Sequence, residues 1–245
     1  MTCNETLQTM MLKKNDIEIN ELVEQFGLTI SRLSHRMIEN PELAKDAAQE
    51  VWYEIIKSID KFNGNSTVST WMYVVAKRTI LKYAQSERVY KDNEINTHFD
   101  LLPIEYIGLE QDKKNWVKEK CDSCLTAFCH CLNNESRLIF LFRDIADLSY
   151  SQISEIMEIG EDNVRQILSR SKEKVRNFMS ENCILYNPEG KCKCRIRKHV
   201  ISVDLDKEYS KLAKTARLVD MFLKFDKKLP RKNYWKEIIA KDVTK

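Results

Sequence analysis

Apolar residues recur with the period of an α-helix over most of the first 180 residues. The first predicted helix ends at Asn40-Pro41, because a residue that precedes proline is disfavoured in helical backbone. A second helix is expected over 42–62 and a third over about 69–86, with a polar loop at 63–67 between them. The apolar stripes of the first two helices are Leu22, Phe26, Ile30, Leu33 and Met37, then Ala48, Trp52, Ile55, Ile59 and Phe62.

The second half of the chain shows a different helical pattern. Helices are expected over about 118–132 and from about 134 onward. Ser149 and Gln152 have the spacing of a capping box, and the short helix that they begin stops at Gly160. A longer amphipathic helix follows directly. A short helix, a tight glycine turn and a second helix predict a helix-turn-helix.

Composition supports an all-α fold. The 245 residues include only five glycines and four prolines, the residues on which sheet-rich folds depend for turns. The sequence contains no apolar run of about 18 residues and no signal-like amino terminus. We therefore expect a cytoplasmic protein without membrane insertion.

Polarity and charge divide the chain further. Residues 87–117 are polar, poorly periodic and contain Pro103 and Gly108, which predicts a linker between two helical domains. The expected domains are 15–86 and 118–180, followed by a Cys-rich extension at 181–199 and a basic helical tail at 200–245.

The formal net charge of +3 conceals two opposite contributions. Residues 181–245 hold 17 Lys and Arg against 9 Asp and Glu, a net of +8, whereas residues 1–180 have a net of −5. An acidic body with a basic tail indicates more than one kind of partner surface.

The outer face of the last helix of the helix-turn-helix has the side chains that read DNA. Gln166 and Arg170 can make bidentate contacts to base edges, and the flanking cations suit phosphates. An ordinary solvated helix is the alternative, which the preceding capped helix and turn disfavour. The candidate DNA-binding residues of this face are Asn163, Arg165, Gln166, Ser169, Arg170, Lys172, Lys174 and Arg176.

Two sets of motifs resemble a known family. The first set is Asp46-Ala47-Ala48-Gln49-Glu50-Val51-Trp52, Asp60-Lys61-Phe62-Asn63-Gly64 and Ser69-Thr70-Trp71-Met72-Tyr73-Val74-Val75-Ala76-Lys77-Arg78. The second is Arg143-Asp144-Ile145-Ala146-Asp147-Leu148-Ser149-Tyr150, Val164-Arg165 and Leu168-Ser169-Arg170. In this order and separation they resemble the extracytoplasmic-function (ECF) type of bacterial RNA polymerase sigma factors. Two departures are Asn133, where the family usually has proline, and Arg170-Ser171-Lys172, where it commonly has Arg-Ala-Arg.

The resemblance implies a non-enzymatic protein that binds core RNA polymerase, recognises and opens promoter DNA, and starts transcription. Core polymerase and promoter DNA are the implied partners, and the family also admits an anti-sigma factor. Two alternatives are a helix-turn-helix regulator that does not bind polymerase, and a thiol or zinc redox sensor. The strand-opening motifs disfavour the first, and the helical context of Cys121 and Cys124 disfavours the second.

The resemblance also assigns residue roles. It makes the candidate DNA-binding residues on the last helix of the helix-turn-helix a −35 face, which would read the −35 element of a promoter. The polymerase-docking residues would be Asp46, Gln49, Glu50 and Tyr53. The loop and helix that bind the −10 element would use Asn63, Gly64, Asn65, Ser66, Thr67, Ser69, Tyr73, Lys77 and Arg78. A solvated helix face is the alternative for the docking residues, and Trp71 is expected in the core.

Eight cysteines fall mainly into two clusters, and the C-terminal cluster resembles an extension found in some ECF-like sigma factors. No cofactor is required by the proposed chemistry, but a tetrahedral structural zinc is one hypothesis. Its thiolates would come from Cys131, Cys183, Cys192 and Cys194, with Cys124 as a substitute for Cys131. A reversible disulfide and small buried hydrophobes are the other two interpretations.

Overall fold

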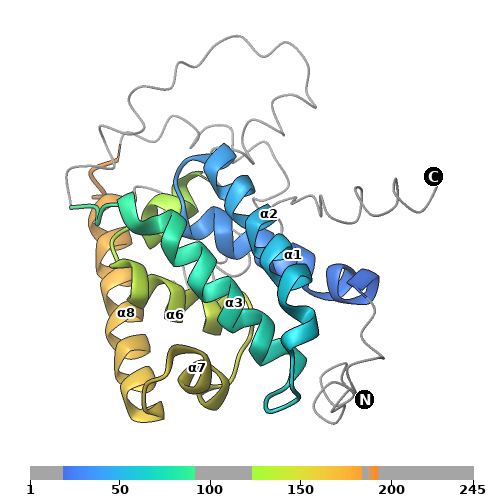
Figure 1. The fold of residues 1–245 in the computed structure, drawn as a ribbon. Coiled ribbons are helices and arrows are strands. Elements are labelled where there is room, and N and C mark those ends of the chain that lie inside the picture. The colour runs from blue at the N-terminus through green and yellow to red at the C-terminus, as the bar shows by residue number, and fades with distance from the viewer. Residues whose placement is uncertain (1–18, 92–122, 184–186, 188, 193–245) are drawn as a thin grey trace. The chain divides into compact units, whose positions relative to one another are not determined.

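The computed structural model describes residues 19–91, 123–183, 187 and 189–192 (Figure 1). These residues form helices and no strands, which confirms the predicted all-α fold for this part of the chain. The tail at 200–245 and nearly all of the predicted linker lie outside the described residues. The main helices are α1 (Ile19–Met37), α2 (Pro41–Ser58), α3 (Val68–Tyr83), α6 (Asn134–Asp144), α7 (Tyr150–Met157) and α8 (Glu161–Asn182). Single 3₁₀ turns extend α2 at Ile59–Lys61 and α3 at Ala84–Ser86, and residues 123–129 are also helical.

By their contacts the described residues form two compact units. The first holds 19–86 and 141–165, and the second holds the described residues of 87–140 and 166–192. In the first unit, α1, α2 and α3 pack against one another, and α3 also packs against α7 (Figure 1). The core of these helices comes from the predicted apolar stripes, including Leu33, Trp52 and Ile55, which are buried.

Local sequence signals set the ends of α2 and α3. The side chain of Asn40 accepts hydrogen bonds from the backbone N–H groups of Glu42 and Leu43, and Pro41 occupies the first helical position, where its missing N–H costs nothing. At the start of α3, the Thr67 hydroxyl accepts from the backbone N–H of Thr70. The third helix therefore begins at Val68, about one residue earlier than the apolar pattern alone predicts.

The turn of the helix-turn-helix differs from the prediction in one respect. The capping box of α7 is present, with Ser149 and Gln152 bonded to each other's backbone. The expected turn at Gly160 lies between α7 and α8, but Gly160 itself does not have a positive φ. The left-handed residue is Glu158, at φ 61° and ψ 39°, and its backbone N–H donates to the carbonyl of Ser154. The exposed Glu158 therefore adopts a left-handed backbone conformation that glycine would adopt at a lower steric cost.

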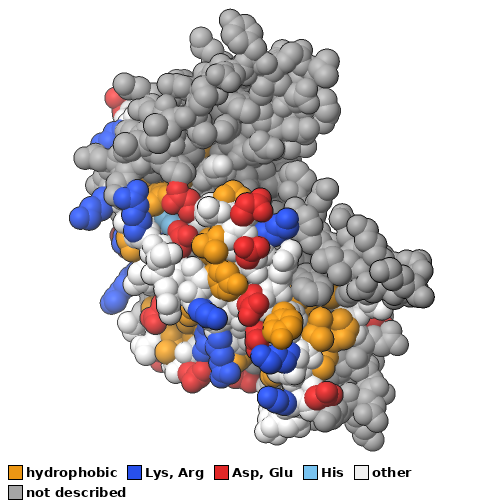
Figure 2. Space-filling model, turned by 45° about the horizontal axis from the view of Figure 1, so that its top comes forward, with side chains coloured by type: hydrophobic (Ala, Val, Ile, Leu, Met, Phe, Trp, Pro, Cys, Tyr) orange, Lys and Arg blue, Asp and Glu red, His pale blue; other side chains and the backbone are white. Residues whose placement is uncertain are grey.

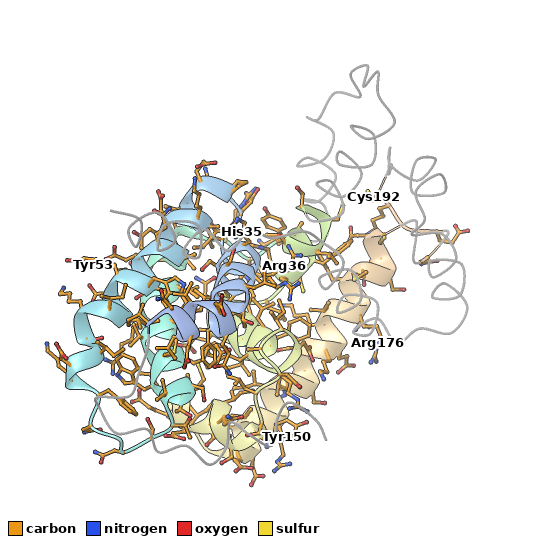
Figure 3. All side chains as sticks on the ribbon, turned by 90° about the vertical axis from the view of Figure 1, so that its right-hand side faces the viewer. His35, Arg36, Tyr53, Tyr150, Arg176 and Cys192 are labelled. Atoms are coloured by element: carbon orange, nitrogen blue, oxygen red, sulfur yellow. The ribbon has the colours of Figure 1, made fainter. Side chains whose placement is uncertain are left out.

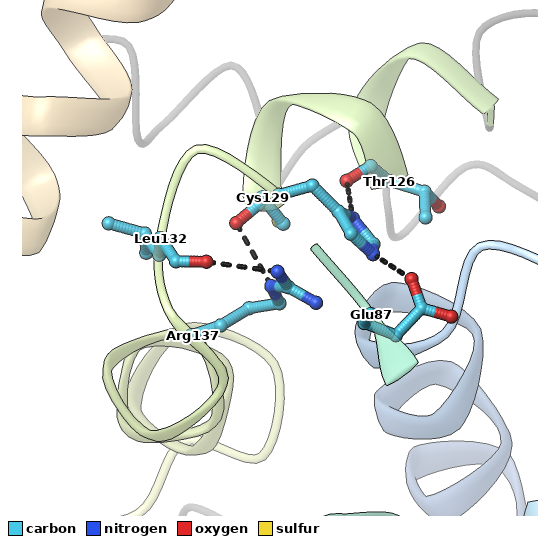
Figure 4. A network of polar contacts seen from close by, with 6 residues as sticks. Glu87, Thr126, Cys129, Leu132 and Arg137 are labelled. Carbon is cyan, nitrogen blue, oxygen red and sulfur yellow. Dashed lines mark hydrogen bonds and ion pairs between the residues drawn. The ribbon is translucent and has the colours of Figure 1, made fainter. Parts of the chain in front are cut away.

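The second unit contains a buried polar network (Figure 4). His130 is fully buried, with Nδ1 2.8 Å from the Thr126 carbonyl and Nε2 2.8 Å from a carboxylate oxygen of Glu87. Arg137 of α6 is equally buried and donates to the carbonyls of Cys129 and Leu132, at 3.1 and 2.9 Å. These carbonyls end the helix at 123–129, so Arg137 fastens α6 to the helix that precedes it.

We expect replacement of Arg137 by methionine to destabilise the protein by about 1–3 kcal/mol, because it removes the buried hydrogen bonds from the guanidinium to the carbonyls of Cys129 and Leu132. The stability of Arg137→Lys should lie between that of the unaltered protein and that of Arg137→Met, because one ammonium group cannot make both hydrogen bonds of the planar guanidinium. Urea unfolding measures the effect, with Arg176→Met on the exposed face of α8 as the control. Equal unfolding midpoints for the Arg137 and Arg176 variants would contradict the structural role.

Candidate protein and nucleic-acid interfaces

The predicted docking residues share one face of α2. Asp46 and Tyr53 are exposed and Gln49 and Glu50 are half-buried, at spacings of three and four residues that place them side by side. The side chain of Tyr53 points outward from the helix (Figure 3) and is 54% exposed. The Nζ of Lys57 lies 5.4 Å from its ring centroid. The structure thus brings these four side chains together in a position open to a partner.

Sequence reasoning missed one member of this face. Ile56 follows Tyr53 by three residues and is 40% exposed, so the face combines acids with two apolar side chains. The sequence indicates that Ile56 is exposed, because this residue lies outside the apolar stripe that contains Trp52 and Ile55. On the face of the molecule shown in Figure 2, acidic, basic and hydrophobic side chains are interspersed. A mixed surface of this kind suits protein docking better than a purely electrostatic contact.

The predicted −10 loop is exposed and tightly turned. Gly64 has φ +75°, a conformation that favours glycine, and the backbone N–H of Asn65 donates to the side chain of Asn63. The Asn63 and Asn65 side chains face solvent. The Thr67 hydroxyl caps α3 and lies 2.9 Å from the hydroxyl of Ser69, so part of the predicted polar set organises the loop itself.

The predicted −10 residues on α3 fall into two groups. Arg78 is exposed, whereas the side chain of Lys77 is only 12% exposed and its Nζ lies 3.0 Å from a carboxylate oxygen of Glu158. Tyr73 is buried at 4% exposure, with its ring edge-on to Phe26 and Phe142 at centroid distances of 6.0 and 5.6 Å. Burial raises the pKa of the Tyr73 hydroxyl well above its usual value.

The predicted −35 face follows one side of α8. Seven of its eight residues are exposed and Lys172 is half-buried. Arg176 points away from the helix (Figure 3). The guanidinium of Arg165 donates to Glu161 at 2.9 Å and stacks 4.7 Å from the ring centroid of Tyr150. Ser171, at the centre of the departure from Arg-Ala-Arg, is buried and so faces the interior of its unit rather than a ligand.

Among the cysteines of the described residues, Cys131 and Cys183 are buried. The backbone N–H of Cys192 donates to the carbonyl of Asn182, which places Cys192 next to the end of α8. Burial raises the pKa of the Cys131 thiol to about 12, against smaller lowering effects of Lys174 and Arg137. A thiol with a raised pKa is a poor redox sensor, because the thiolate is the reactive form.

The described residues contain no group of three or more Cys, His, Asp or Glu that could hold a metal ion. Cys194 lies outside them, so the zinc hypothesis stays a prediction. Among the same described residues, no helix is both long enough and apolar enough to cross a membrane.

Comparisons with known proteins agree with this geometry. A family model described as Sigma-70 region 2 matches residues 22–89, and one described as Sigma-70, region 4 matches residues 124–175. The chain is similar to the RNA polymerase sigma factor YlaC of Bacillus subtilis, with 25% identity over 69% of this chain and 96% of YlaC. It is also similar to the ECF RNA polymerase sigma factor SigM of the same organism, with 23% identity over 64% of this chain and 93% of SigM. The chain is also similar to the ECF RNA polymerase sigma-E factor of Escherichia coli K12, with 21% identity over 71% of this chain and 93% of that protein.

One solved structure, of CnrH in complex with the cytosolic domain of CnrY, matches with a TM-score of 0.50 and 11% identity. It covers 66% of this chain and 87% of that chain, and it supports the fold alone. The two family models match in the order that the motifs predict, and the relatives are covered over nearly their whole length. This chain therefore contains sigma-70 regions 2 and 4, and it is similar in sequence to RNA polymerase sigma factors that include extracytoplasmic-function members.

Proposed function

We propose that this protein binds core RNA polymerase and directs it to promoters, where it recognises the −35 element, opens the −10 element and initiates transcription. The observation that carries the proposal is the presence of both sigma regions in one chain, each with its predicted surface on an exposed helix or loop. A regulator that only binds double-stranded DNA has no use for the first region. The protein is not an enzyme, since the polymerase performs the chemistry.

Three surfaces would divide the work. The mixed face of α2 provides carboxylates, an amide and the ring of Tyr53 to a basic partner surface on the polymerase. The loop at 63–67 provides backbone and side-chain amides that can bond the edge of an unstacked base. Holding such a base in a pocket offsets its unstacking, which costs a few kcal/mol. The exposed cations of α8 would position its helix on the DNA backbone.

Location and regulation follow from the same proposal. A protein that works on polymerase and DNA is expected in the cytoplasm. The structural neighbour CnrH is bound to the cytosolic domain of CnrY, and an anti-sigma factor is the corresponding expected partner here.

In vitro transcription with purified core polymerase tests the function directly. We expect promoter-dependent transcripts from a genomic template library only when this protein is added. The absence of such transcripts on every template would overturn the proposal. The promoters found in this way provide the DNA for the measurements below.

A structural zinc at the cysteines is a separate proposal. Its support is the hydrogen bond that holds Cys192 beside the end of α8, close in sequence to Cys183. A bound zinc would deprotonate its thiol ligands and fasten the extension to the helices.

We predict that Gln49→Ala combined with Glu50→Ala weakens binding to core polymerase about tenfold, or about 1.4 kcal/mol, without unfolding the protein. Surface plasmon resonance measures the affinity. The matched control is Glu21→Ala combined with Gln25→Ala, which removes the same two groups from exposed positions of α1. Equal affinities for the two double variants would show that the docking face lies elsewhere.

We predict different effects for two arginines of α8. Arg170→Ala should cost about 1–3 kcal/mol on the correct −35 sequence and relax the preference there, as expected for a base contact. Arg176→Ala should weaken binding to all DNA sequences by the same factor. It should also reduce the number of counterions released on binding by about one, as expected for a phosphate contact. Holoenzyme binding to matched and mismatched promoters at several salt concentrations distinguishes them. Identical profiles for the two variants would contradict the assignment.

We predict about one zinc per chain in protein purified without oxygen. Elemental analysis measures it, and Cys183→Ser should lower the content while Cys3→Ser, outside both cysteine clusters, should leave it unchanged. A content well under one per chain in the unaltered protein would exclude the zinc site.

A further inference from the structure

Tyr150, the first residue of α7 (Figure 3), is in contact with two arginines. The central carbon of the Arg143 guanidinium lies 5.1 Å from the centroid of the tyrosine ring, and that of Arg165 lies 4.7 Å from it. Both distances are within the range of a cation–π contact. All three residues belong to the first compact unit.

The position of the ring is fixed by contacts on its own side of the motif. The Nη1 of Arg143 donates to the carbonyl of Leu148 at 2.7 Å, so this guanidinium is itself held in place. Ser149 begins α7 with both hydrogen bonds of a capping box, which fixes the backbone directly before Tyr150. The ring therefore has a defined position on which another side chain can rest.

One edge of the Arg165 guanidinium is occupied by acids of the same helix. Its Nη2 donates to a carboxylate oxygen of Glu161 at 2.9 Å, and its Nε lies 3.9 Å from a carboxylate oxygen of Asp162. Among the described residues no acceptor contacts its Nη1, and 52% of the side chain is exposed. The edge between Nη1 and Nη2 thus keeps N–H groups for a partner outside the protein.

The charge around this guanidinium favours a base over a phosphate as that partner. Arg165, Glu161 and Asp162 together carry one positive and two negative charges. A phosphate contact depends on positive charge, whereas a bidentate contact to O6 and N7 of guanine depends on the planar pair of donors. A guanidinium that is already held by a ring and a carboxylate also loses little conformational freedom when it binds.

We propose that Tyr150 is a positioning residue for promoter reading, whose ring holds the Arg165 guanidinium with its open edge toward a guanine of the −35 element. This inference rests on the proposed function. It also gives a role to both ends of the motif that runs from Arg143 to Tyr150. The arginine fixes the ring, and the ring fixes the arginine that reads DNA.

Holoenzyme binding to a promoter found by transcription tests the proposal, together with copies in which each G·C pair of its −35 element is replaced in turn. Arg165→Ala should remove the preference at one of these pairs, which identifies the base that Arg165 reads. Tyr150→Leu removes the aromatic face and should lower the preference at the same pair about two- to fivefold, the range for an exposed cation–π contact. Tyr150→Phe keeps the ring and should retain the preference.

The preference is a ratio of two affinities, so a variant that only destabilises the motif lowers both affinities and leaves the ratio unchanged. In Arg165→Ala protein, Tyr150→Leu should not change the preference further, because the side chain that the ring supports is absent. An effect that persists in this background, or one at a different base pair, would overturn the proposal. An equal loss in Tyr150→Phe and Tyr150→Leu would also overturn it, because the hydroxyl would then be the group that acts.

Transcription by the holoenzyme distinguishes the two levels of inference. With normal promoter-dependent transcription by the unaltered protein, an Arg165→Ala variant that weakens binding to all DNA sequences by the same factor overturns the positioning role alone. A Tyr150→Leu variant that keeps the full preference has the same consequence. Absence of promoter-dependent transcription overturns the proposed function itself.

Discussion

Burial of the apolar side of α3 is the constraint on which the first unit depends. Met72, Ala76 and Ile80 of this helix lie in the core, and α1, α2 and α7 all pack against it. Once that side is buried, the helical period fixes where Lys77 and Arg78 can lie. The loop at 63–67 is tied to the same helix through the Thr67 cap, so the position of α3 also sets the position of the predicted base-binding loop.

Periodicity and capping were enough to predict most of this arrangement. The break at Asn40-Pro41, the capping box at Ser149 and the outward face of α8 all depend on neighbours within four residues, which a sequence displays directly. The turn between α7 and α8 was predicted at the right place, but the sequence did not indicate its left-handed residue. Gly160 is the residue that sequence statistics favour, whereas the left-handed backbone is at Glu158, where a bond to the Ser154 carbonyl and an ion pair to Lys77 hold it.

Contacts between distant positions could not be predicted in this way. Glu87 and His130 are 43 residues apart, and neither belongs to a motif that indicates a partner. Arg137 looks like an ordinary surface cation of an amphipathic helix, but it is buried because the carbonyls at the end of the preceding helix need donors. The same limit applies to Tyr73, whose exposure depends on Phe26 and Phe142 and not on its own helix.

The contacts that α3 makes with Phe142 and Glu158 are individually weak. An exposed ion pair is among the weaker contacts in proteins, and an edge-on aromatic pair such as Tyr73 with Phe142 contributes about 0.5–1.5 kcal/mol beyond its buried area. Since α2 packs directly against α3, the surface that would bind polymerase and the surface that would bind DNA belong to adjacent helices of one core.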